Sequence, residues 1–150
     1  MKKIIKLTAF FLGISILLIV FIRLFFPIYR IASDSMKPTM NKGDYILVSR
    51  FHYEFFEPNR NDIVLFEPIN EIFKLGPWSH RIIAIEGDSV SIKNNVIFIN
   101  EKKALFPIVN HKDLDTTVPE SFIFQKGDNA ETIIGLVPKD KIVGKVIFSF

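Results

Sequence analysis

Cysteine is absent from the 150-residue sequence, which excludes disulfide bonds, a thiol nucleophile and cysteine-ligated zinc. His52 and His111 have no spacing typical of a metal-ligand pair, so no metal site is expected. The sequence also lacks internal repeats and low-complexity stretches. Although the net charge is +3, the basic residues form no stripe interleaved with aromatic residues. Nucleic acid is therefore not an expected partner.

Polar residues are scarce near the N-terminus, where an apolar run extends from Leu7 to Ile28 with a single interruption at Arg23. A helix over this run would be ~33 Å long, which matches the apolar thickness of a bilayer. Pro27 can end such a helix, and Arg23 can extend its side chain to the headgroups. The residues after the run do not form the small-residue site at which secretory signals are cleaved. We expect an uncleaved membrane anchor over residues 1–30, with a transmembrane helix at about 7–28.

The basic residues around this run predict its orientation. Lys2, Lys3 and Lys6 precede the span, and two arginines flank its far end. This modest bias favours a cytoplasmic N-terminus. The sequence therefore predicts a single-pass protein of the inner or plasma membrane, with residues 31–150 on the outer, extracytoplasmic side.

Beyond Ile31 no helical period is sustained, and short runs rich in Ile, Val and Phe recur between Gly, Pro, Asn and Asp. The candidate strands are Tyr45–Ser49, Asp62–Phe66, Arg81–Glu86, Ser89–Ile92, Val96–Asn100 and Lys141–Phe148. Such a pattern predicts a mainly β fold, in which residues 31–150 form one antiparallel β-sheet or barrel-like domain.

Turn residues support this prediction. The clearest hairpin turns at Asn94 and Asn95, because asparagine tolerates the positive φ that a two-residue primed turn requires. The segment Leu105–Pro119 is polar and irregular, and is expected to be an insertion loop or flap. Three aspartates in Gly-Asp or Asn-Asp steps are expected to cap turns: Asp44, Asp62 and Asp88.

Two serines follow the predicted membrane segment closely, in the run SDSMKPTM over residues 33–40. This run resembles the S-x-S-M-x-P-T-L motif of type I signal peptidases, which also follows a transmembrane segment. Further segments resemble motifs of that family in the same order: Gly43–Val48, Asn61–Phe66, His80–Asp88, and Gly127–Asn129 with Gly135–Pro138 and Ile142–Lys145. The resemblance covers nearly the whole chain. It implies a membrane-bound serine endopeptidase that removes N-terminal signal peptides from secreted preproteins.

The resemblance also implies roles for individual residues. Ser35 matches the nucleophile that attacks the scissile carbonyl, and Ser33 matches the residue whose hydroxyl joins the Ser35 N–H in the oxyanion hole. Met36 and Pro38 are expected to shape the loop that presents the serine, and to help bind substrate. The reaction would pass through an acyl-enzyme and need no metal or organic cofactor.

The general base departs from the family's usual pattern. Most bacterial members carry a lysine before the motif arginine, whereas this sequence has His80. A histidine titrates near 6.5 and so needs only placement and an orienting partner. Members resembling the endoplasmic-reticulum enzyme also pair serine with histidine, supported by an acid that Asp128 matches here. Glu131 is a weaker candidate for that acid, and Lys74 is an alternative base.

Other functional interpretations stay open at this point. One is a specialised, conjugation-type peptidase with a single substrate. Another is a non-catalytic, membrane-tethered β-domain that binds peptides, which the histidine substitution and the shortened C-terminal motif would explain. A third is a soluble binding domain released after signal removal. The expected partners are preprotein substrates and the lipid bilayer, and the sequence does not indicate an oligomeric state.

Overall fold

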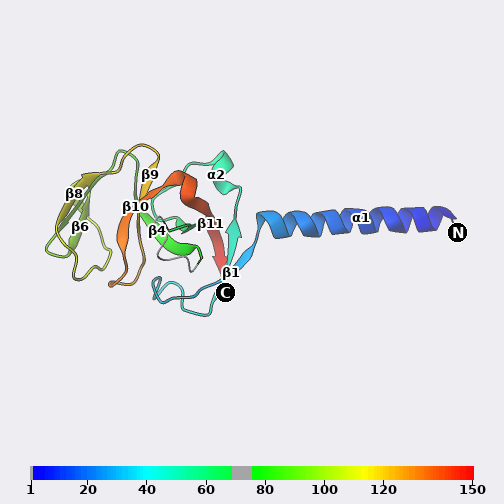
Figure 1. The fold of residues 1–150 in the computed structure, drawn as a ribbon, viewed down its shortest axis with the longest axis horizontal. Helices are drawn as coiled ribbons and strands as arrows, with labels where there is room; N and C mark the ends of the chain where they lie inside the picture. Colours follow the sequence, from blue (N-terminus) through cyan, green and yellow to red (C-terminus); the bar gives the residue numbers. More distant parts are fainter. Residues whose placement is uncertain (1, 69–75) are drawn as a thin grey trace.

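The computed structural model describes residues 2–68 and 76–150. A long helix, α1 (Lys2–Phe25), projects from a body of antiparallel β-sheets (Figure 1). This arrangement confirms the predicted fold class. The helix begins earlier than expected and ends before Pro27, because proline has no N–H to continue a helix. Strand β1 (Ile28–Arg30) follows at once, so the expected last turn at Ile28 is part of a sheet.

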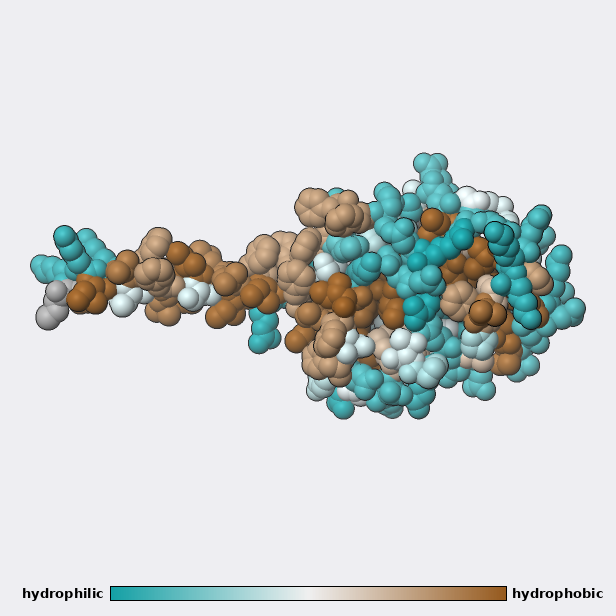
Figure 2. All heavy atoms as spheres, turned by 180° about the vertical axis from the view of Figure 1, so that it is seen from behind, coloured by the Kyte–Doolittle hydropathy of each residue, from teal (hydrophilic) through white to brown (hydrophobic). Residues whose placement is uncertain are grey.

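Helix α1 is long and apolar enough to cross a membrane, and none of its residues is buried against the protein body. Figure 2 shows apolar residues along its length and hydrophilic residues at its free end. A helix that is apolar on all sides is stable in lipid or in a protein core, and not in water. These features are consistent with the predicted membrane anchor.

The larger sheet has seven strands, and all its neighbours are antiparallel. Across the sheet the strands are β1, β2 (Tyr45–Ser49), β11 (Ile142–Ser149), β3 (Ile63–Phe66), β4 (Trp78–Ile85), β9 (Phe122–Lys126) and β10 (Ile134–Pro138). The C-terminal strand β11 lies between two early strands, so the sheet is complete only when both ends of the chain have paired. Among the described residues, two short helices connect its strands: α2 (His52–Phe55) and the 3-10 helix η2 (Lys139–Lys141).

The smaller sheet lies at the end of the body away from α1 (Figure 1). Its four strands are β7 (Lys102–Lys103), β6 (Val96–Ile99), β5 (Ser89–Lys93) and β8 (Leu114–Thr117), in that order. The predicted hairpin is confirmed: Lys93 pairs with Val96, and Asn94 and Asn95 have φ of 50° and 59°. Strand β8 lies within Leu105–Pro119, so part of this segment is regular rather than a loop.

Strands β9 and β10 were not foreseen from the sequence. In β9 the last four residues are all buried, and these include Gln125 and Lys126. Burial on both faces removes the alternation by which a half-exposed strand is recognised. The polar residues at the end of this apolar run therefore concealed a buried strand, which lies between β4 and β10 in the larger sheet.

The three predicted turn caps are confirmed. The carboxylates of Asp44, Asp62 and Asp88 each accept a hydrogen bond from the main-chain N–H three residues earlier, at 2.8, 3.2 and 2.8 Å. Such bonds satisfy turn amides that would otherwise lack a partner. These aspartates therefore have structural rather than catalytic surroundings.

Two methionines attach the segment after β1 to the larger sheet. Met36 and Met40 are almost completely buried, and they pack in one cluster with Ile46, Val48 and Leu65. Full burial of such a side chain is worth roughly 1.5–3 kcal/mol. The residue next to Ser35 is thus anchored in the core, which keeps the serine at the surface of the sheet.

Gly144 provides a test of the close packing between β11 and β2. A Cβ at this position would lie 2.4 Å from the Ser49 carbonyl oxygen and 2.8 Å from Val48 Cγ1. We expect Gly144→Ala to lower the free energy of unfolding by about 1–3 kcal/mol, measured by denaturant unfolding of the detergent-solubilised protein. Gly135→Ala in β10 is the matched control, because its Cβ would meet nothing within 4 Å. Equal stability of the two variants would contradict the prediction.

Candidate active site

One cavity of ≈ 710 Å³ contains three of the predicted site residues in its wall: Ser33, Ser35 and His80. The serines come from the loop after β1, and the histidine comes from β4. A third segment, the turn between β9 and β10, contributes Asn129 and Thr132. Residues far apart in sequence therefore meet at a single opening in the body.

The main chain of Ser35 is held from the far side of this cavity. Its carbonyl oxygen accepts hydrogen bonds from the Asn129 N–H at 3.0 Å and from the Thr132 hydroxyl at 3.1 Å. Its own hydroxyl accepts a hydrogen bond from the Ser33 hydroxyl at 3.1 Å. The loop is thus held on one side by the buried Met36 and on the other by the turn after β9.

Gly127 allows the turn after β9 to lie close to the Ser35 loop. A Cβ at this position would lie 2.5 Å from the Ser35 carbonyl oxygen and 2.4 Å from Thr132 Cγ2. Only a residue without a side chain fits where two main chains lie so close together. The glycine of the Gly-Asp-Asn motif is therefore explained by the position of the serine.

His80 lies in a nearly closed environment and is only 2% exposed. Its Nδ1 atom is 2.5 Å from Gln125 Oε1, and the rings of Phe66 and Trp78 have centroids 5.6 and 5.9 Å away. Burial lowers the pKa of His80 to about 4, although the hydrogen bond to Gln125 acts to raise it. The imidazole is consequently neutral near pH 7 and able to accept a proton.

Ser35 and His80 face the same cavity but share no hydrogen bond within the described residues. The hydroxyl of Ser35 is hydrogen-bonded to the Ser33 hydroxyl, and Nδ1 of His80 is hydrogen-bonded to Gln125. An amide oxygen at Nδ1 selects the tautomer with a proton on Nδ1, which makes Nε2 the accepting nitrogen. Proton-transfer contacts in free enzymes are often loose and tighten when substrate is bound.

Asp128, the predicted orienting acid, is paired with Arg81. Two hydrogen bonds join the guanidinium to the carboxylate, at 2.8 and 2.7 Å, and the Thr39 hydroxyl donates to the same carboxylate. Although burial acts to raise the pKa of Asp128, these hydrogen bonds lower it below its usual value. The side chain that meets Nδ1 of His80 is Gln125, and the charge of Asp128 acts on the histidine from further away by raising its pKa.

The other predicted residues lie in different surroundings. Glu131 is part of the cavity wall, whereas Met36 is buried in the core beneath the loop, and neither Met36 nor Pro38 is among the lining residues. The alternative base Lys74 lies outside the described residues. Within residues 2–68 and 76–150, no cluster of three His, Asp or Glu side chains could hold a metal ion.

Two residues close to the site were missed by sequence reasoning: Gln125 and Lys126. Lys126 is 1% exposed, and its ammonium group donates to the carbonyl oxygens of Gly127 and Asn129 at 2.7 and 2.9 Å. Burial lowers the pKa of Lys126 to about 8. The signal that could have found them is a polar pair at the end of the apolar run Phe122–Phe124, directly before the Gly-Asp-Asn motif.

Comparison with known proteins identifies the family of this chain. The signal peptidase, peptidase S26 family matches residues 1–150. The probable signal peptidase I-1 of Synechocystis is 30% identical over 135 residues, which cover 80% of this chain and 68% of that protein. Signal peptidase IB of Staphylococcus aureus is 30% identical over 149 residues, covering 81% of this chain and 76% of that protein.

A chloroplast protein is also similar. Thylakoidal processing peptidase 1 of Arabidopsis thaliana is 28% identical over 137 residues, covering 80% of this chain and 40% of that protein. A solved signal peptidase I from Enterococcus faecalis aligns with a TM-score of 0.46 and 21% identity, over 61% of this chain and 97% of that chain. Because the family match extends from the first residue to the last, this chain belongs to the signal peptidase family, peptidase S26.

Proposed function

We propose that this signal peptidase I removes signal peptides from preproteins with Ser35 as its nucleophile and His80 as its general base. The observation that carries the proposal is the shared cavity, whose wall includes Ser33, Ser35 and His80. Family membership supplies the reaction, which is hydrolysis of a peptide bond by a serine peptidase. The cavity supports the assignment of the reacting groups.

In this mechanism Ser35 Oγ attacks the scissile carbonyl carbon while Nε2 of His80 accepts the hydroxyl proton. The tetrahedral intermediate collapses when the imidazolium gives that proton to the leaving amine, which leaves an acyl-enzyme on Ser35. His80 then removes a proton from the water that attacks the ester, and the imidazolium returns this proton to Ser35 Oγ as the ester bond breaks. Each step returns the histidine to its neutral form, so no further proton donor is required.

The surroundings of His80 suit a base that is charged only briefly. Gln125 Oε1 accepts a hydrogen bond from Nδ1–H and so orients the ring. Both Gln125 and the more distant Asp128 act to raise the pKa of His80, because they favour the imidazolium form. In this proposal Gln125 is the orienting partner, and Asp128 stabilises the imidazolium through its charge.

Ser33 is the proposed oxyanion donor together with the Ser35 N–H. In the free enzyme its hydroxyl donates to Ser35 Oγ. Once that oxygen is bonded to the substrate, the Ser33 hydroxyl is available to turn toward the developing oxyanion. A donor of this kind is typically worth about 3–4 kcal/mol in the transition state.

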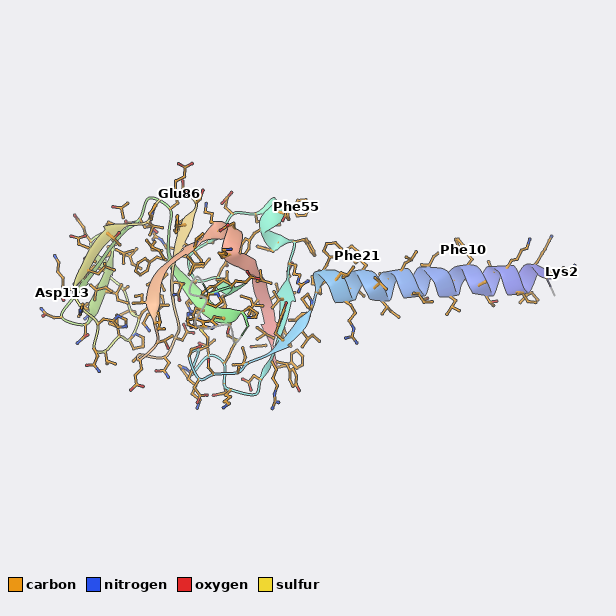
Figure 3. All side chains as sticks on the ribbon, in the orientation of Figure 1. Lys2, Phe10, Phe21, Phe55, Glu86 and Asp113 are labelled. Atoms are coloured by element: carbon orange, nitrogen blue, oxygen red, sulfur yellow. The ribbon has the colours of Figure 1, made fainter. Side chains whose placement is uncertain are left out.

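We further propose that α1 anchors the enzyme and that the sheets form the catalytic domain on the outer side of the membrane; because β1 pairs with β2, the boundary lies before Ile28 rather than after residue 30. Aromatic contacts join the two parts, since the ring of Phe51 lies 5.9 Å from that of Phe25 and 6.3 Å from that of Phe55. Figure 3 shows Phe55 on the side of the body that faces α1. A short connection from α1 to Ser35 keeps the nucleophile near the headgroups, where a membrane-bound signal peptide is cleaved.

The proposal predicts the effect of removing either reacting group. In detergent, the full-length protein should cleave a preprotein with an Ala-x-Ala site, and Ser35→Ala should lower kcat by about 10³-fold or more. His80→Ala should lower it comparably, because the two residues act as a unit. Cleavage that survives Ser35→Ala contradicts the nucleophile assignment. A wild type that binds but cleaves none of a panel of preproteins supports the peptide-binding interpretation instead.

The pH profile tests the base separately. Because burial lowers the pKa of His80 to about 4, kcat/KM should be level near neutrality and fall only as the pH approaches that value. Gln125→Glu places a negative charge at Nδ1 and should move this acid limb to higher pH. Gln125→Leu, the control of similar size, removes an interaction that raises the pKa, so its acid limb should not move upward. If the acid limb of kcat/KM falls at the same pH in Gln125→Glu and Gln125→Leu, His80 is not the titrating base.

A further inference from the structure

The turn after β9 is held by a buried cation, Lys126, which exchanges no proton in the proposed reaction, although its charge acts to lower the pKa of His80. Lys126 is the last residue of β9, and its ammonium group spans that turn to donate to the carbonyl oxygens of Gly127 and Asn129. Burial of a lysine is costly unless its charge is compensated by hydrogen bonds. The cost indicates that this side chain does more than fill space.

Asn129 connects the same turn to the nucleophile. Its N–H donates to the Ser35 carbonyl oxygen at 3.0 Å, and its side-chain Nδ2 donates to the Asp34 carbonyl oxygen at 3.2 Å. These two carbonyls belong to the peptide groups on either side of Ser35. Because a peptide group is planar, a hydrogen bond to the Asp34 carbonyl also fixes the direction of the Ser35 N–H.

We propose that Lys126 is a positioning residue for the nucleophile: by holding the 127–129 turn, it lets Asn129 fix both peptide planes that flank Ser35. The inference rests on the proposed roles of Ser35 and its N–H. Lys126 itself touches neither serine. Its carbonyl partners belong to the turn, and the effect reaches Ser35 through Asn129.

The contacts of Lys126 explain why a charged side chain suits the end of β9. Near pH 7 the ammonium has three N–H donors, since the lowered pKa of about 8 is still above neutrality. The opposing charge of Asp128 acts to raise this pKa, and Arg81 lies directly across from Lys126 in the neighbouring strand. An apolar residue in β9 would leave the Gly127 carbonyl oxygen without this partner, and the turn would move to find another.

The expected consequence is a loss of kcat with little change in KM. The Ser35 N–H and Oγ act on the transition state, so their misorientation affects the chemical step more than substrate binding. Misplacement of reacting groups by ~1 Å can lower the rate by ~10²-fold. We therefore expect Lys126→Met to lower kcat by about 10- to 100-fold while KM stays within about twofold.

The experiment compares full-length wild type, Lys126→Met and Lys145→Met in detergent. Methionine preserves most of the volume and suits a buried site, so the first variant should fold. Lys145 is the matched control: it is a partly buried lysine of the same sheet, paired with Asp62 at 2.7 Å. We expect Lys145→Met to leave kcat within about twofold of wild type, since its partner Asp62 caps a turn and neither residue is part of the cavity wall.

Hydrogen exchange supplies a second measurement that does not depend on activity. The Asn129 N–H donates to Ser35, so its exchange should be faster in Lys126→Met and unchanged in Lys145→Met. If the wild type cleaves no preprotein, the proposed function fails, and exchange at Asn129 still decides whether Lys126 holds the turn. The proposal is overturned if Lys126→Met lowers kcat without faster exchange of the Asn129 N–H, or if it speeds this exchange without lowering kcat. A loss as complete as that of Ser35→Ala also overturns it, because Lys126 would then take part in proton transfer.

Discussion

The carbonyl oxygen of Ser35 is the point on which the active region depends. It accepts hydrogen bonds from the main chain of Asn129 and from the hydroxyl of Thr132, and Gly127 leaves room for it. These bonds join the loop after α1 and β1 to a turn almost a hundred residues later in the chain. The cavity between them exists only because both segments are attached to the same sheet, through Met36 on one side and β9 on the other.

Burial determines the chemistry of the groups around this point. The family's usual lysine base must lose solvent to become neutral near pH 7. In this chain the same position holds His80, and burial lowers its pKa to about 4. An imidazole with so low a pKa is neutral near pH 7, but it accepts a proton only weakly. Gln125 and Asp128 act in the opposite direction, because each favours the protonated imidazole.

The pairing of Arg81 with Asp128 links the strand of His80 to the turn that holds Ser35. Arg81 follows His80 in β4, and Asp128 precedes Asn129, whose N–H holds Ser35. A bidentate, partly buried pair of this kind constrains both direction and distance. A movement of β4 relative to the turn would therefore disturb both sides of the cavity together.

The sequence by itself determined the apolar helix, the antiparallel β fold, the Asn94–Asn95 hairpin and the order of the family motifs. These features depend on local propensity or on short runs of residues, which a linear reading detects. Only the tertiary structure decided that Gln125 meets His80, that Asp128 pairs with Arg81 and that Lys126 is buried beside the Ser35 loop. Strand β9 is buried along its last four residues and so lacks an alternating pattern. Its partners are set by pairing across the sheet, which spacing along the chain does not encode.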